Sequence, residues 1–64
     1  MTVIATRVED GLNVFVHDKD GQIKVEINGA FINATNTSTD NWDSLDFEQK
    51  EALLDYYVSI YRSY

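Results

Sequence analysis

The sequence predicts an α+β fold, in which an antiparallel β-meander of three to four strands is followed by one C-terminal α-helix packed on one sheet face. Two observations lead to this fold class. First, three turn dipeptides divide the first half of the chain into short segments rich in β-branched residues. They are Asp10-Gly11, Asp20-Gly21 and Asn28-Gly29. Such dipeptides favour tight hairpin turns, because the central turn residues need positive φ angles. Second, apolar residues in the last third of the chain recur with a helical period.

Four segments are expected to form strands, and their short connections make neighbouring strands antiparallel. They span residues 2–9, 12–17, 22–28 and 30–34. The third segment has the clearest alternation: Ile23, Val25 and Ile27 occupy one side and polar residues the other, so the apolar side should face a core. In the second segment, Phe15 lies on the side opposite the aliphatic residues. Phe15 is therefore either exposed, as a partner site requires, or buried by a twist or bulge.

Residues 33–43 are polar and are expected to form a loop. The helix should begin between Asp43 and Asp46, and two starts are compatible with the sequence. If Asp43 is the N-cap, Trp42 and Phe47 have the spacing of a hydrophobic staple. If Asp46 is the N-cap, Gln49 lies where a capping box requires it.

The predicted helix has an apolar arc of roughly 160°, wider than the stripe of about 100° that covers one sheet. The arc contains Phe47, Leu53, Leu54, Tyr57, Val58, Ile60, Tyr61 and Tyr64. Because tyrosine is favoured at protein interfaces, the surplus width predicts a homodimer as one interpretation. The residues for such self-association are Phe15, Tyr56, Tyr57, Tyr61 and Tyr64. The alternative is that tyrosine hydroxyl groups reach water at the rim of a small core.

Sixty-four residues are expected to form a single domain, residues 1–64. The chain has no cysteine and one histidine, which excludes disulfides and argues against a zinc site. The segment 18–21 resembles a calcium loop, but Val16 and Ile27 stand where an EF-hand needs oxygen ligands. His17 has no nucleophile beside it in the sequence. We therefore expect no enzymatic activity, no metal site and no cofactor.

Eleven acidic against five basic residues give a net charge of −6. This charge disfavours direct binding to nucleic acid or to an anionic membrane, since both require Lys and Arg. No apolar stretch approaches the roughly 20 residues that cross a bilayer, and the N-terminus lacks the features of a signal peptide. The expected location is the cytoplasm of the producing or host cell.

The acids gather at the start of the predicted helix. They are Asp40, Asp43, Asp46, Glu48, Glu51 and Asp55, with Lys50 as the one base among them. Glu48, Glu51 and Asp55 have helical spacing and form a ridge roughly 10 Å long opposite the apolar arc. Such a row of carboxylates can replace phosphate groups, so we expect it to bind a basic protein surface, such as that of a nucleic-acid-processing enzyme. Asp43 and Asp46 extend the ridge, and Trp42 is its expected apolar anchor. The alternative is a solvated helix face that keeps the protein soluble.

In size, negative charge and lack of cysteine or catalytic residues, the chain resembles the short acidic proteins that bacteriophages make to block host enzymes. The resemblance implies a non-catalytic inhibitor or modulator that imitates DNA, and it assigns no role to any single residue. The alternative function is that of a structural or assembly protein, acting as a homodimer through its aromatic helix face.

Overall fold

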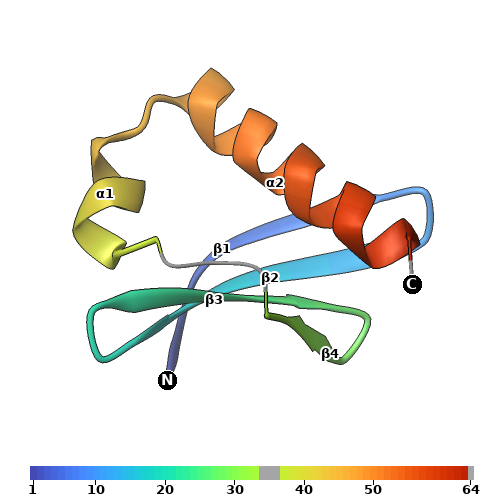
Figure 1. Cartoon of the computed structure of the whole chain (residues 1–64), viewed down its shortest axis with the longest axis horizontal. Coiled ribbons are helices and arrows are strands. Elements are labelled where there is room, and N and C mark those ends of the chain that lie inside the picture. The colour runs from blue at the N-terminus through green and yellow to red at the C-terminus, as the bar shows by residue number, and fades with distance from the viewer. Residues whose placement is uncertain (34–36, 64) are drawn as a thin grey trace.

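The computed structural model describes residues 1–33 and 37–63. Its elements in chain order are β1 (Thr2–Glu9), β2 (Leu12–Lys19), β3 (Gln22–Ile27), β4 (Ala30–Ile32), α1 (Thr39–Ser44) and α2 (Phe47–Arg62). The strands form one antiparallel sheet in the order β1-β2-β3-β4, and the C-terminal helix α2 packs on one face of it (Figure 1). The predicted α+β fold is confirmed.

All three hairpin turns form at the predicted dipeptides. In the first turn, Asp10 has a φ of 46° and Gly11 a φ of 77°. In each of the other two turns, both residues of the dipeptide also have a positive φ. The third turn is fixed further by Asn28, whose Oδ1 accepts a hydrogen bond from the backbone N–H of Asn13 at 2.8 Å. Asp and Asn tolerate the left-handed conformation better than other residues with a Cβ atom, so local chemistry sets the strand connections.

The core lies between the sheet and α2. The alternating residues of β2 and β3 that were expected to face it are all buried. They are Leu12, Val14, Val16, Ile23, Val25 and Ile27. Ile32 from β4, Trp42 from α1 and three residues of α2 complete the cluster. A fully buried aliphatic side chain stabilises the fold by about 1.5–3 kcal/mol. Because the period-two pattern places these side chains on one face of the sheet, their burial requires a second layer on that face.

The other face of the sheet, here called the open face, is covered by no described element. Phe15 lies on this face and is 36 % exposed, so it is not tucked into the core. It lies opposite Thr6 on β1 and Glu26 on β3, and Glu26 in turn lies opposite Phe31 on β4. The open face therefore combines exposed aromatic rings with charged residues.

The expectation that residues 33–43 form a loop is wrong for the part that becomes α1. The Ser38 side chain accepts a hydrogen bond from the backbone N–H of Asn41 at 3.1 Å and so caps this short helix. The Thr39 hydroxyl donates to Asp18 at 2.5 Å, which attaches α1 to the β2–β3 hairpin. With Trp42 buried in the core, cap and anchor together make a helix from a segment of polar composition. The fourth strand, expected to reach residue 34, ends at Ile32, and residue 34 lies outside the described residues.

Of the two predicted helix starts, the structure has the second. Asp46 is the N-cap of α2, and it forms a capping box with Gln49. Phe47 was expected in the apolar arc, but it is 76 % exposed. It lies seven residues before the buried Leu54 and therefore on the same side of the helix. Its exposure means that the first turn of α2 extends beyond the sheet. In the described residues, neither helix has the length and apolar character required to span a bilayer.

Candidate functional site

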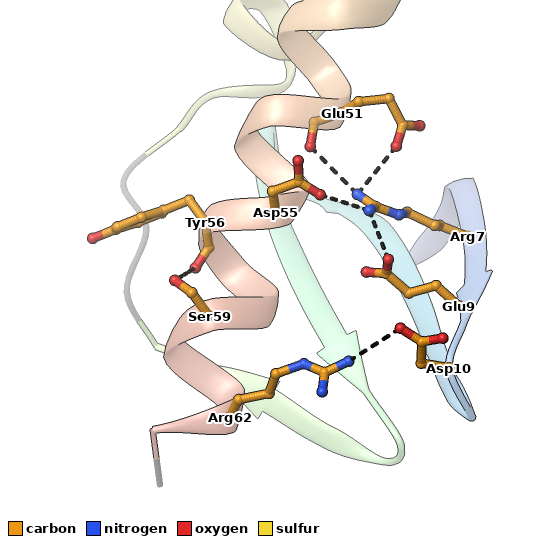
Figure 2. A network of polar contacts seen from close by, with 8 residues as sticks. All are labelled: Arg7, Glu9, Asp10, Glu51, Asp55, Tyr56, Ser59 and Arg62. Atoms are coloured by element: carbon orange, nitrogen blue, oxygen red, sulfur yellow. Dashed lines mark hydrogen bonds and ion pairs between the residues drawn. The ribbon is translucent and has the colours of Figure 1, made fainter.

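Three carboxylates, Glu9 of β1 and Glu51 and Asp55 of α2, surround one guanidinium group. Arg7 extends from β1 towards α2 (Figure 2). Its Nη2 lies 2.6 Å from Asp55 Oδ1 and 3.0 Å from Glu9 Oε2, and its Nη1 lies 3.1 Å from Glu51 Oε2. Nη1 also donates to the backbone carbonyl of Glu51 at 3.3 Å. The Arg7 side chain is 17 % exposed, so the guanidinium group at the centre of this network is largely enclosed.

The network raises the pKa of Arg7, chiefly through the hydrogen bond from Arg7 to Asp55 and with smaller contributions from Glu9 and Glu51. Arg7 therefore keeps its charge and holds the two helix carboxylates to β1. This corrects the expectation that Glu48, Glu51 and Asp55 form one free ridge. Glu51 and Asp55 are bound to the protein's own arginine, and neither belongs to a free acidic surface.

Four other carboxylates are exposed around the junction of the two helices. They are Asp40, Asp43, Asp46 and Glu48, and together they are called the acidic corner below. Among residues 1–33 and 37–63, none of the four forms an ion pair. Sequence reasoning identified this group but gave Asp40 no site role, because its place in a helix was not foreseen.

Three members of the acidic corner have a structural reason to be acidic. Asp40 and Glu48 lie in the first turns of α1 and α2, and Asp46 caps α2. Negative charge near a helix N-terminus is stabilising by about 0.3–1 kcal/mol. Asp43 differs, because it lies in the last turn of α1, where the helix dipole does not favour an acid. The structure thus explains each of these carboxylates except Asp43.

Trp42 is buried in the core, so the expectation that it anchors a partner is wrong. The Lys50 ammonium group lies over the Trp42 ring, 5.4 Å from its centre, which is a cation–π distance. The exposed aromatic next to the acidic corner is instead Phe47. Sequence reasoning missed Phe47 because its helical spacing assigned it to the core.

The tyrosines expected at a self-association surface are divided between core and solvent. Tyr57 is buried in the core, and burial raises its pKa. Tyr61 is partly buried against the same cluster, whereas Tyr56 is exposed. Tyr64 lies outside the described residues. The aromatic arc of α2 is thus largely used by the protein's own sheet, which removes Tyr57 from any subunit interface.

The lone histidine belongs to a polar pair on the open face. His17 Nε2 lies 2.8 Å from Glu26 Oε1, and the centre of the His17 ring lies 6.4 Å from that of Phe15 and 5.5 Å from that of Phe31. Nearby, a shallow hollow of about 260 Å³ is lined by Met1, Lys19, Lys24, Phe31 and Asn33. Among the described residues, no group of three or more His, Cys, Asp or Glu side chains is placed to hold a metal ion.

Comparison of the chain with protein-family models, with curated proteins and with solved structures finds no match.

Proposed function

We propose that this protein is a small acidic, non-catalytic interaction protein that binds a basic protein surface through the acidic corner. One observation supports this proposal above all. Asp43 and Glu48 are exposed and have no ion-pair partner in the described chain, whereas Glu51 and Asp55 are held by Arg7. Carboxylates that the protein does not neutralise itself are those that a cationic partner can bind.

The surroundings of the acidic corner suit a protein partner. Like charges on neighbouring helix turns cost a few tenths of a kcal/mol each, and a partner rich in Lys and Arg removes this cost. Phe47 projects from the same region and is exposed. An exposed aromatic beside charged groups supplies the apolar contact that typically dominates binding energy at an interface. Charge then sets the association rate, and Phe47 contributes to the lifetime of the complex.

The partner we propose is a nucleic-acid-binding enzyme, which this protein inhibits or modulates in the cytoplasm of the producing or host cell. Such enzymes bind phosphate groups with Lys and Arg. Carboxylates at the turn between two helices present negative charge to the same cationic residues. Binding by the acidic corner then excludes DNA or RNA from the enzyme, as expected of a phage-like inhibitor that imitates DNA.

The proposal is tested by affinity capture with two matched double variants. Asp43→Asn combined with Glu48→Gln removes two charges of the acidic corner. Asp10→Asn combined with Asp20→Asn removes two charges from hairpin turns, where Asn tolerates the positive φ. Both doubles change the net charge from −6 to −4, by adding 2 to −6. Wild type and both doubles are immobilised, exposed to extract of the producing or host cell, and washed with duplex DNA.

The expected result is a partner retained by wild type and by the turn double variant, lost from the corner double variant and released by duplex DNA. Release by DNA identifies a protein held at its nucleic-acid site. Equal retention on all three baits, or retention that duplex DNA does not affect, is incompatible with binding through the acidic corner at such a site.

A further inference from the structure

The outer edge of β1 has no partner strand within the described residues. β1 is the first strand in the sheet order and is eight residues long. It contributes no buried residue to the core. An edge strand presents backbone N–H and C=O groups that can pair with another strand, and natural proteins usually protect such edges with charge, proline or a covering element.

Most residues of β1 favour strand pairing. Five of its eight residues are β-branched, namely Thr2, Val3, Ile4, Thr6 and Val8. Val3 is 48 % and Val8 76 % exposed. The strand has no lysine or proline, and its two charged residues, Arg7 and Glu9, are paired with each other. The long outer edge therefore lacks the usual charged protection.

A bulge in β1 determines which residues share a face. The register shifts between Val3 and Ala5, which leaves Ile4 as the extra residue. Ala5 lies opposite the buried Val16, and Thr6 lies opposite the exposed Phe15. Residues directly opposite in an antiparallel pair share a face. Val3, Thr6 and Val8 therefore face the open side of the sheet, and Thr2, Ala5, Arg7 and Glu9 face the helix side.

We propose that β1 pairs antiparallel with β1 of a second copy, which joins the two four-stranded sheets into one continuous sheet. The two-fold axis passes midway between the Thr6 residues of the two copies, which lie opposite each other. Val8 of each copy then lies opposite Val3 of the other on the open face, with Ile4 skipped as a bulge. On the helix side, Arg7 lies opposite Ala5 of the second copy, and Glu9 lies opposite Thr2.

This register uses the whole strand and opposes no like charges. An axis through Arg7 sets the two guanidinium groups against each other, and an axis through Ala5 leaves Glu9 without an opposite residue. Cross-strand pairs of β-branched residues each stabilise a sheet by roughly 0.2–1 kcal/mol, and the dimer forms two Val3–Val8 pairs. A two-fold axis perpendicular to the sheet keeps the helix layers of both copies on the same face of the joined sheet. Pairing of the two β1 strands therefore buries no helix surface. The dimer does not depend on the proposed function.

The test is sedimentation equilibrium from about 10 μM to about 1 mM, a range that covers weak association. Two double variants examine the register. Val3→Lys with Val8→Lys sets lysine against lysine, with a net charge of −6 + 2 = −4. Val3→Glu with Val8→Lys sets lysine against glutamate twice, with a net charge of −6 − 1 + 1 = −6. Phe31→Lys on β4 is a control at the far side of the open face. Far-UV circular dichroism checks that each variant folds.

We expect wild type, the Glu/Lys variant and the Phe31 variant to dimerise, and the Lys/Lys variant to associate at least about tenfold more weakly. The Glu/Lys variant has the larger repulsive net charge, so its dimerisation identifies the Val3–Val8 pairing. Amide hydrogen exchange gives a second readout, because protection of β1 in wild type should rise with concentration. A wild type that is monomeric throughout, a Lys/Lys variant that dimerises fully, a monomeric Glu/Lys variant, or dissociation caused by Phe31→Lys overturns the proposal.

Discussion

Arg7 Nη2 lies 2.6 Å from Asp55 Oδ1, although the two residues are 48 positions apart in the chain. This contact joins the edge strand β1 to the middle of α2 (Figure 2). β1 has no fully buried residue, and its Ala5 is partly buried against the core, so backbone pairing with β2 and the Arg7 network are the main contacts that hold it beneath the helix. The network therefore has a structural role, and the free carboxylates of the acidic corner are those it leaves out.

Replacing Arg7 with Gln should lower the free energy of unfolding by about 1–2 kcal/mol. This is more than the 0.2–1 kcal/mol of a typical exposed ion pair, because Glu9, Glu51 and Asp55 are left close together without a counter-charge. Urea unfolding followed by circular dichroism measures the loss. The loss should shrink as salt rises, since the screening length falls from about 10 Å at 0.1 M to about 3 Å at 1 M.

Arg62→Gln is the matched control for this prediction. Arg62 is exposed and lies 3.9 Å from Asp10, so its loss should change the free energy of unfolding by less than about 0.5 kcal/mol. Equal effects of the two substitutions, or a loss at Arg7 that salt does not alter, contradict a stabilising role of the network.

The β-sheet could be predicted from the sequence because its determinants are local. Each turn dipeptide fixes its own hairpin, and the alternation in β3 fixes which face is buried. α1 was not predictable in the same way. Its composition is that of a loop, and it depends on the burial of Trp42 against strands distant in sequence. A non-local contact therefore overrides the local pattern.

The candidate site was predicted only in part, for a related reason. The clustering of acids at the start of α2 is visible in the sequence, but whether a carboxylate is free depends on tertiary contacts. Glu51 and Asp55 form ion pairs with Arg7, which is distant in sequence, and no spacing in the sequence predicts these contacts. Trp42 was expected to be an exposed anchor and is buried, whereas Phe47 was expected to face the core and is exposed. With Asp46 as the N-cap, Phe47 is the first residue of α2 and lies beyond the sheet.

Two substitutions at Asp46 should separate its capping role from its charge. Asp46→Ala removes the side-chain acceptor that caps Gln49 N–H at 2.8 Å, and it should lower the free energy of unfolding by about 1 kcal/mol. Asp46→Asn keeps an N-cap acceptor and should cost only a few tenths of a kcal/mol from the lost helix-dipole interaction. Thermal unfolding measures both. Equal losses for Ala and Asn would show that the charge matters at this position and the cap does not.

Tyr57 should make the protein less stable in alkaline solution. Burial raises the pKa of Tyr57, whereas in the unfolded chain its pKa is about 10. Above about pH 10, the unfolded chain releases this proton and the folded protein keeps it. The folded state then binds more protons, so the free energy of unfolding falls as pH rises, by up to about 1.4 kcal/mol per pH unit, until the folded protein also ionises.

Urea unfolding at intervals between about pH 8 and pH 11 measures this slope. Tyr57→Phe should remove the Tyr57 part of the slope. Tyr56→Phe, at an exposed position that adds less than burial does to the raised pKa of Tyr57, should leave most of it. The same slope in Tyr57→Phe and wild type would mean that the buried hydroxyl is not the group responsible.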